Sequence, residues 1–503
     1  MSGRTKLAAV LAISALVAAP TATASAAAEP AGPALAKKLA KKVTTEGVNR
    51  HLIAFQRLAD RNGGNRAALS PGYNASVDYV AGKLREEGFI VSTPTFSFEV
   101  PVSDAELARV DGVNYQAIVM TASPQTPVGG VTGPLRVVPE DATTGCEETD
   151  FAGQDFTGSI ALIRRGGCTF EQKHLNAFAK GAIAVLVSNN VAGPLSGVTL
   201  TNPGKIPTGG ISQADGTTLA SKAGATTTVD MRFHNETRTD RNVIAETRTG
   251  RKNNVVMAGA HLDSVELGAG INDNGSGSAG LLETALQLGS RPKVDNAIRF
   301  AWWGAEERGL IGSEEWVRSL TFEQQLDIAL YLNFDMIGSP NAAYFVYDGD
   351  NSDGVGAGPG PFGSAQIEKA FVDYFTATGV QTEGTDFSGR SDYGEFIAVG
   401  IPAGGLFTGA EGIKTAAQAA KWGGTAGIAY DPCYHSKCDN LGNIDRKALG
   451  RNAGALAFVT ASYGVSTEDV NGVPPRAKRA EARSSAALMK AAHADDHSHA
   501  AVA

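Results

Sequence analysis

Potential metal ligands stand at the ends of apolar segments in the second half of this sequence. His261 follows the run NVVMAGA, and the adjacent Glu306 and Glu307 follow FAWWGA. Asp335 ends the run YLNFD. Carboxylates are rarely placed in apolar surroundings unless a partner binds them there. This repeated placement predicts a bound cation near the ends of these segments.

Two loops supply further ligands of the same types. Asp273 lies in the glycine-rich loop GAGINDNGSGSAG, and His435 lies in DPCYHSKCDN, between two cysteines. Two histidines and several carboxylates form a donor set that suits zinc. The set is larger than one tetrahedral ion can use, so we expect two zinc ions that share a carboxylate.

The two adjacent glutamates can perform different tasks. Side chains of neighbouring residues in an extended segment point to opposite sides. One of Glu306 and Glu307 can therefore bind metal, while the other is free to move protons as a general base.

Each of these residues also has an ordinary structural interpretation. A Glu-Glu pair commonly adds charge at the start of a helix, and a single histidine is commonly a hydrogen-bonded structural residue. Asp273 stands in a turn-forming sequence, and Asp335 could cap the next element. The glycine-rich loop lacks the Lys-Ser/Thr of a P-loop and the glycine spacing of dinucleotide-binding loops. It is the repetition of ligand types at strand ends that favours the metal site.

The elements that would position these ligands alternate between strands and helices. The predicted strands are 254–260, 297–304 and 329–336, and the predicted helices are 278–288 and 312–320. This alternation predicts an α/β fold, with a mixed, largely parallel sheet and helices on both faces. Ligands of such sheets bind beyond the carboxyl ends of the strands, where the candidate residues stand.

The rest of the chain divides into further segments. Residues 35–62 and 76–89 have helical apolar spacing, and residues from about 119 to 239 are rich in Gly, Thr and Val with short β-like runs. The latter segment indicates a separate unit. After a last predicted helix at 445–464, residues 466–503 are rich in Ala, Ser and charge, which is typical of a disordered or removable tail.

The tail also contains the motif HADDHSH, near its end. These residues could bind metal. A solvated, charged chain terminus is the simpler interpretation.

The first residues predict export. Arg4 and Lys6 precede the apolar run LAAVLAISALVAA, and small residues end in Ala24-Ser25-Ala26. Residues 1–26 thus have the pattern of a cleaved secretory signal peptide. No later segment reaches the roughly 18 apolar residues that a membrane span needs. We expect a secreted, extracellular protein without a membrane span.

The composition indicates how large the hydrophobic core can be and which molecules the protein can bind. Of 503 residues, 43% are hydrophobic, which is enough for a large core and more than one domain. With 44 basic and 52 acidic residues the formal net charge is −8, and the body of the chain has no dense basic segment. Nucleic acid is therefore a poor candidate partner.

The four cysteines fall into two local pairs, Cys146 with Cys168 and Cys433 with Cys438. In an exported chain each pair predicts a disulfide. The alternative, one metal site made of all four, lacks the usual two-residue spacing within a pair.

Several segments together resemble a known enzyme family. HLDS, GINDNGSG, WWGAEERGLIGS, LNFDMIG, GRSDYGEF and DPCYHSKCDN occur in the order found in the secreted co-catalytic zinc aminopeptidases. The match spans about 240 to 460, and the helices of 40 to 100 resemble the family's opening segment. The segment 119–239 resembles a protease-associated (PA) domain inserted as in aminopeptidase Y-type enzymes, and Cys146 and Cys168 match its usual cysteine pair.

The resemblance implies a zinc exopeptidase fold and a domain organisation. Residues 36–118 and 240–465 would form a discontinuous zinc peptidase domain, interrupted by the PA domain. A monomer that acts on peptides or proteins with a free N-terminus is expected.

The resemblance also implies a role for each candidate residue. Asp273 would bridge two zinc ions, His261 and Asp335 would complete one site, and Glu307 and His435 would complete the other. Glu306 matches the general base. No ligand of the family is missing, whereas some relatives that only bind partners have lost ligands.

Three further residues match supporting positions of the family. Asp263 matches a carboxylate that orients the His261 imidazole, a role that metal-bound histidines commonly require. Tyr434 matches a hydroxyl that stabilises the oxyanion, although it could also be a packing aromatic. Arg390 lies where related enzymes use backbone to hold the substrate amine, although it could also be an ordinary surface arginine.

The expected reaction is removal of an N-terminal residue, with apolar residues such as leucine preferred. A carboxypeptidase or dipeptidase of the same fold would instead need a cationic pocket for a free carboxylate. An inactive binding protein would hold no zinc, and a glutaminyl cyclase-like transferase would hold one zinc ion per chain.

Overall fold

The computed structural model describes residues 1, 31–195, 198–356, 358–472 and 476–484. Apart from Met1, the expected signal peptide at residues 1–26 lies outside the described residues, as does the HADDHSH motif. The chain forms two compact units. We call Met1–Phe96 with Asp240–Ala503 the main unit, and Ser97–Thr239 the inserted unit.

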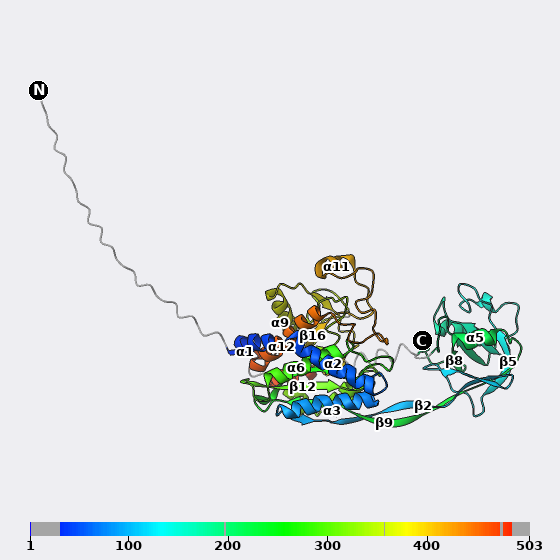
Figure 1. Ribbon diagram of the computed structural model, residues 1–503, viewed down its shortest axis with the longest axis horizontal. Helices are drawn as coiled ribbons and strands as arrows, with labels where there is room; N and C mark the ends of the chain where they lie inside the picture. The colour runs from blue at the N-terminus through cyan, green and yellow to red at the C-terminus, as the bar shows by residue number, and fades with distance from the viewer. Residues whose placement is uncertain (2–30, 196–197, 357, 473–475, 485–503) are drawn as a thin grey trace. The chain divides into compact units, whose positions relative to one another are not determined.

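The main unit contains one sheet and a set of helices (Figure 1). Its strands are β1 (Ile90–Ser92), β10 (Val243–Glu246), β11 (Arg251–His261), β12 (Asn296–Trp303), β13 (Ile328–Phe334), β14 (Phe345–Tyr347), β15 (Glu383–Thr385) and β16 (Ala403–Phe407). Its named helices are α1 (Ala31–Lys42), α2 (Thr45–Arg61), α3 (Pro71–Glu86), α6 (Gly275–Leu288), α7 (Ile311–Ser319), α8 (Phe322–Asp327), α9 (Ser364–Ala377), α10 (Gly394–Ala398), α11 (Ala416–Trp422), α12 (Arg446–Val465) and α13 (Glu468–Asn471).

The sheet of the main unit has the strand order β1-β10-β12-β11-β13-β16-β14-β15. The central strands β12, β11, β13 and β16 are parallel, whereas antiparallel pairs join β1 to β10, β10 to β12 and β14 to β16. The chain passes from β11 first to β12 on one side and later to β13 on the other. In such sheets, ligands bind at the carboxyl ends of strands where the direction of winding changes.

Helices cover both faces of this sheet, because the side chains of the central strands alternate between two buried clusters. Val256, Ala258 and Ala260 of β11 belong to one cluster, which includes side chains of α2, α6 and α12. Met257 belongs to the other, with side chains of α7 and α10. The strands are thus apolar on both faces, as the continuous runs predict. The predicted fold class is confirmed.

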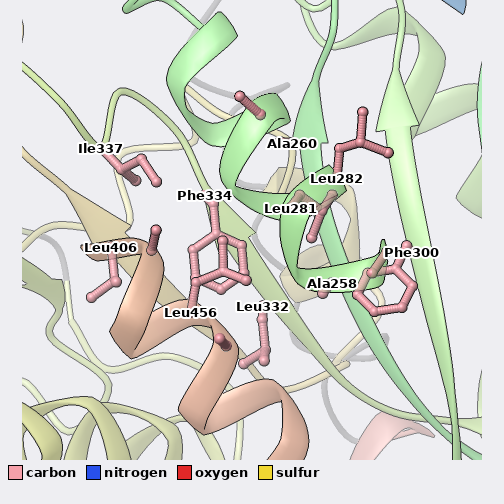
Figure 2. Close-up of a cluster of buried hydrophobic side chains, with 14 of the residues drawn as sticks. Ala258, Ala260, Leu281, Leu282, Phe300, Leu332, Phe334, Ile337, Leu406 and Leu456 are labelled. Carbon is pink, nitrogen blue, oxygen red and sulfur yellow. The ribbon is translucent and has the colours of Figure 1, made fainter. Parts of the chain in front are cut away.

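Large side chains fill the first of these clusters (Figure 2). Leu281 and Leu282 of α6, Phe334 at the end of β13 and Leu456 of α12 are fully buried. Burial of each such side chain stabilises the fold by about 1.5 to 3 kcal/mol. Segments from opposite ends of the main unit meet here, since α1 packs along α12 (Figure 1).

The inserted unit has its own sheet and small cores. Its elements are β2 (Thr95–Val110), β3 (Val113–Gln116), β4 (Ile118–Val119), β5 (Val131–Val137), the 3₁₀ helix η1 (Glu148–Phe151), β6 (Ile160–Arg164), α4 (Phe170–Ala179), β7 (Ala184–Ser188), β8 (Thr208–Ile211), α5 (Gln213–Ala220) and β9 (Thr226–Arg241). The strand order is β3-β2-β9-β5-β6-β7-β8-β4, with two buried clusters against it. Cys146 and Cys168 form a disulfide in this unit.

The inserted unit begins at Ser97, earlier than the boundary near 119 that the composition indicates. The reason is the long strand β2, which forms an antiparallel hairpin with β3 and lies next to β9 in the sheet. Strand pairing with distant residues therefore decides the boundary, and local composition does not reveal it.

The segment after residue 465 is partly folded, contrary to the expectation of a disordered tail from 466. Besides α13, residues 476–484 are helical. Arg479 and Arg483 of this helix are buried and donate hydrogen bonds to the carbonyl groups of Leu326 and Ile328. Carbonyl groups at the end of a helix such as α8 lack partners within it, so arginine donors stabilise them. Within the described residues, no helix has both the length and the apolar character needed to cross a membrane.

Candidate metal centre and active site

The strand register brings the predicted ligands to one edge of the main sheet. His261 ends β11 beside Trp303, the last residue of β12, and Glu306 and Glu307 follow shortly after. Gly259 of β11 pairs with Asn333 of β13, so Asp335 lies level with His261. Three neighbouring parallel strands thus deliver ligands to the same place, as the sequence predicts.

A first group of ligand atoms forms around His261. Its Nε2 atom lies 3.2 Å from Oδ1 of Asp273 and 3.4 Å from Oδ1 of Asp335. One potential ligand atom from each of the three residues lies within 4.8 Å of the others, and all three residues are buried. The group therefore has the size and the donor types of a metal site.

A second group shares Asp273 with the first. Nε2 of His435 lies 3.2 Å from Oδ2 of Asp273 and 2.9 Å from Oε2 of Glu307. The two oxygens of the Asp273 carboxylate therefore face different histidines. A carboxylate in this position can bridge two cations.

The unpaired atoms of these groups fit bound cations. Oε1 of Glu307 and Oδ1 of Asp335 are buried and have no hydrogen-bond partner among the described residues. A buried, unpaired carboxylate oxygen is costly unless a cation or a donor approaches it. The donors are imidazole nitrogens and carboxylate oxygens, which suit zinc.

The electrostatics of the groups lead to the same conclusion. Burial, reinforced by Asp273, raises the pKa of the Glu307 carboxyl to about 7. Burial alone would raise the pKa of Asp273, but hydrogen bonds from His261 and His435 hold it well below its usual range. Several buried carboxylates thus compete for two imidazole groups, and divalent cations would supply the missing positive charge.

Glu306 lies beside these groups without belonging to either. Its Oε2 atom is 3.9 Å from Nε2 of His261, and the residue is 9% exposed. Burial raises the pKa of Glu306 well above the usual carboxyl value; His261 opposes this shift, and the carboxylates of Asp335 and Asp392 add to it. A carboxyl group with a raised pKa next to a metal site is suited to take up and return a proton.

Asp263 contacts the glutamates more closely than it contacts the imidazole. Its carboxylate accepts hydrogen bonds from the backbone N–H groups of Glu306, at 3.2 Å, and Glu307, at 3.3 Å. Its Oδ1 atom is 3.7 Å from Nδ1 of His261, which instead lies 3.2 Å from the backbone carbonyl oxygen of Asp263. The Asp263 side chain thus lies within ion-pair distance of the imidazole, whose nearer contact is the backbone carbonyl, and the carboxylate also holds the Glu306–Glu307 turn.

Two residues that support the ligands were not predicted. The carboxylate of Asp439 accepts hydrogen bonds from the backbone N–H groups of Asn272, at 2.8 Å, and Asp273, at 3.0 Å. The Ser391 hydroxyl donates to Oδ2 of Asp335 at 2.6 Å. In the sequence, only their neighbours point to these two residues. Asp439 directly follows the disulfide loop that contains His435, and Ser391 directly follows Arg390.

Tyr434 and Arg390 lie together at the cleft. The Tyr434 ring stacks on the His435 ring, with 3.9 Å between centroids. Nη2 of Arg390 donates to the Tyr434 hydroxyl at 3.3 Å, and Nη1 donates to Oε1 of Glu411 at 2.8 Å. Cys433 and Cys438 form the predicted disulfide around His435. The loop that carries Tyr434 and His435 is thus closed covalently.

A cavity of about 600 Å³ opens over both ligand groups. The lining includes the five predicted ligands, Glu306, Tyr434 and Arg390. Apolar and aromatic side chains form another part of its wall, namely Leu310, Met336, Tyr347, Phe407 and Tyr430. Asp263 lies outside this lining, behind the glutamate turn. The cavity is therefore polar at its ligands and apolar beside them.

Comparison with known proteins identifies the family. A model of peptidase family M28 matches residues 242–460, which include every predicted ligand. A probable lipoprotein aminopeptidase, LpqL, from Mycobacterium tuberculosis is 46% identical over 449 residues, covering 88% of this chain and 90% of the relative. The chain belongs to peptidase family M28. A probable leucine aminopeptidase 2 from Aspergillus fumigatus is 45% identical and covers 82% of this chain and 81% of the relative.

Solved structures and a second family model complete the comparison. The zinc aminopeptidase BSAP from Bacillus subtilis matches with a TM-score of 0.63 and 26% identity, over 84% of this M28 peptidase and 94% of that chain. A PA domain model matches residues 131–219, within the inserted unit. The resemblance to zinc aminopeptidases with an inserted PA domain is thereby confirmed, and the protein is a hydrolase of the aminopeptidase type.

Proposed function

We propose that this M28 peptidase is a dinuclear zinc aminopeptidase that removes an apolar, leucine-like residue from the free N-terminus of peptides or proteins. The observation that carries the proposal is the Asp273 carboxylate, whose two oxygens face His261 and His435 separately. His261 and Asp335 would complete one zinc site, and Glu307 and His435 would complete the other. A monomer is proposed.

Zinc held by these residues would lower the pKa of water and polarise the scissile carbonyl group. The chain supplies the remaining steps. Glu306 accepts a proton from the attacking water and returns it to the leaving amine, which its raised pKa favours. The Tyr434 hydroxyl donates a hydrogen bond to the oxyanion of the tetrahedral intermediate.

The lining of the cavity supports a substrate with a free amine and an apolar side chain. The lining also contains acidic groups outside the two ligand groups, Glu306 and Asp386, which would attract an α-ammonium group and repel a free carboxylate. The wall of Met336, Tyr347, Phe407 and Tyr430 offers an apolar surface to the first side chain. The name of the Aspergillus relative is in keeping with this preference. A carboxypeptidase would need a cationic group free to bind a carboxylate, whereas Arg390, the arginine among the described residues that line the cavity, is paired with Glu411.

We propose that the signal-like residues 1–26 direct secretion. The mycobacterial relative is named a lipoprotein, so release into the medium must be distinguished from attachment to the membrane. Fractionation of producing cells into medium, membrane and cytosol makes this distinction.

A comparison of substrates tests the activity. Leucine p-nitroanilide should be hydrolysed, while its N-acetyl derivative and an N-acylated dipeptide should be resistant, because only the first has a free α-amine. Chelation should abolish the hydrolysis, and added zinc should restore it. Preferential hydrolysis of the N-acylated dipeptide would contradict the proposal and favour a carboxypeptidase or dipeptidase.

A further inference from the structure

We infer that the guanidinium group of Arg390 is a positioning residue that directs the Tyr434 hydroxyl hydrogen into the cleft. This inference rests on the proposed function of the site. It gives the Arg390 side chain a different role from the one that the resemblance implies, in which only the backbone at this position would hold the substrate amine.

The hydrogen bond between Arg390 and Tyr434 can have only one direction. A guanidinium group has N–H donors and no acceptor, so the Tyr434 oxygen must accept the bond from Nη2 of Arg390. The O–H of Tyr434 cannot then be donated to Arg390. No other hydrogen bond of this hydroxyl is present among the described residues, so its hydrogen is free to point at a group bound in the cleft.

The remaining contacts fix both partners. Glu411 accepts from Nη1 of Arg390 at 2.8 Å, so the two ends of the guanidinium fork are held by an acidic and a phenolic group. The Tyr434 ring is held by its stacking on His435 and by the closed disulfide loop. The hydroxyl oxygen thus contacts the Arg390 cation, and Tyr434 lines the same cavity as the ligand groups.

The charge of Arg390 also makes the hydroxyl a better donor. A cation that donates to a phenol oxygen polarises the O–H bond, so the hydrogen bond to a developing oxyanion becomes stronger. This contribution appears only when negative charge develops on the substrate. It therefore lowers the barrier to reaction more than it tightens substrate binding.

A double-mutant cycle tests the inference with Arg390→Gln, Tyr434→Phe and the two combined. Tyr434→Phe should lower kcat about 100-fold, as loss of an oxyanion donor does. Arg390→Gln should lower kcat about tenfold with little change in KM, and should have no further effect when Tyr434 is already Phe. Arg390→Lys should restore part of the loss, because it returns the charge. Zinc content and thermal unfolding should match the parent in each variant.

The chain offers a matched control for Arg390. Nη1 of Arg451 donates to the Tyr344 hydroxyl at 3.0 Å, away from the residues that line the cavity. Arg451→Gln removes the same kind of bond and should leave kcat unchanged.

A second measurement does not depend on turnover. The phosphonic acid analogue of leucine carries the negative charge of the oxyanion, so calorimetry should show that it binds Arg390→Gln about tenfold more weakly than the parent.

Four results would overturn the inference. Additive effects in the cycle would mean that Arg390 acts independently of Tyr434, and a change confined to KM would mean a direct contact with substrate. An Arg390→Gln variant with parental kinetics would leave only the backbone role. A Tyr434→Phe variant with parental kcat would remove the hydroxyl from the reaction while the aminopeptidase activity of the parent still stood.

Discussion

At the scale of single residues, Glu306 and Glu307 are neighbours with different surroundings. Oε2 of Glu307 lies 2.9 Å from His435 within a ligand group, whereas Glu306 lies outside both groups, 3.9 Å from His261. Asp263 fixes this difference by accepting the backbone N–H groups of both. Glu307 is therefore placed to bind metal, and Glu306 is placed to transfer protons.

This division predicts the behaviour of Glu306→Gln. The variant should retain its zinc, because no ligand is changed, but its kcat should fall by about 10²- to 10⁴-fold with the loss of the general base. Metal analysis and steady-state kinetics on leucine p-nitroanilide provide the measurement. Glu315→Gln, an exposed glutamate on α7, is the control and should change neither quantity. Normal turnover by Glu306→Gln would remove Glu306 from the mechanism.

The sequence indicates the candidate ligands but not the residues that hold them. His261 and Asp335 are recognisable because they end apolar strands, and parallel strand ends meet at one edge. Asp439 and Ser391 support Asp273 and Asp335 through contacts between segments far apart in the chain. Such contacts depend on the completed fold, so spacing in the sequence does not reveal them.

At the scale of elements, the start of α6 joins the metal-binding loop to the sheet. Oδ1 of Asn274, next to Asp273, accepts the backbone N–H of Gly277 at 2.9 Å and caps the helix. Its Nδ2 atom donates to the carbonyl oxygen of Phe334 at 2.9 Å. This one side chain therefore ties the loop, the helix and the end of β13 together.

Gly277 is the position at which this junction has no space for a side chain. A Cβ atom there would lie 2.1 Å from the Phe334 carbonyl oxygen and 2.4 Å from Oδ1 of Asn274. Gly277→Ala should lower the free energy of unfolding by about 1 to 3 kcal/mol. It should also weaken zinc retention, because Asp273 precedes the displaced cap.

Gly82→Ala is the matched control for this prediction. Gly82 lies inside α3, where an added Cβ would meet no atom within 4 Å. This variant should raise the free energy of unfolding by about 0.5 to 1 kcal/mol, since alanine is the better helix former. Urea unfolding of the two variants measures both effects. A shift in the same direction in both would contradict the packing argument.

Prediction from sequence succeeds for elements whose pattern is local. The strands 254–260 and 329–336 and the helix 278–288 correspond to β11, β13 and α6, because their apolar runs and helical spacing lie within single segments. The short strands β14 and β15 carry no such pattern. These segments are strands because β14 pairs with β16 and β15 pairs with β14, which extends the sheet beyond β16.

At the scale of the whole molecule, distant segments complete each unit. The inserted unit begins earlier than its composition indicates, because β2 shares a sheet with β9 more than a hundred residues later. The helix at 476–484 packs within the main unit because Arg479 and Arg483 donate hydrogen bonds to backbone carbonyl groups there. From the local sequence alone, these arginines would be expected at the surface. Composition locates the units, but their limits follow from these long-range contacts.

In the proposed dinuclear site, two cations would be held by His261 at the end of β11 and by four loop residues, Asp273, Glu307, Asp335 and His435. The most direct test is the zinc content of the purified protein and of Asp273→Asn, measured by elemental analysis after dialysis. We expect two zinc ions per chain in the parent protein and loss from both sites in Asp273→Asn, because each site would lose a charged ligand. One zinc ion per parent chain, or two retained by Asp273→Asn, would contradict this expectation.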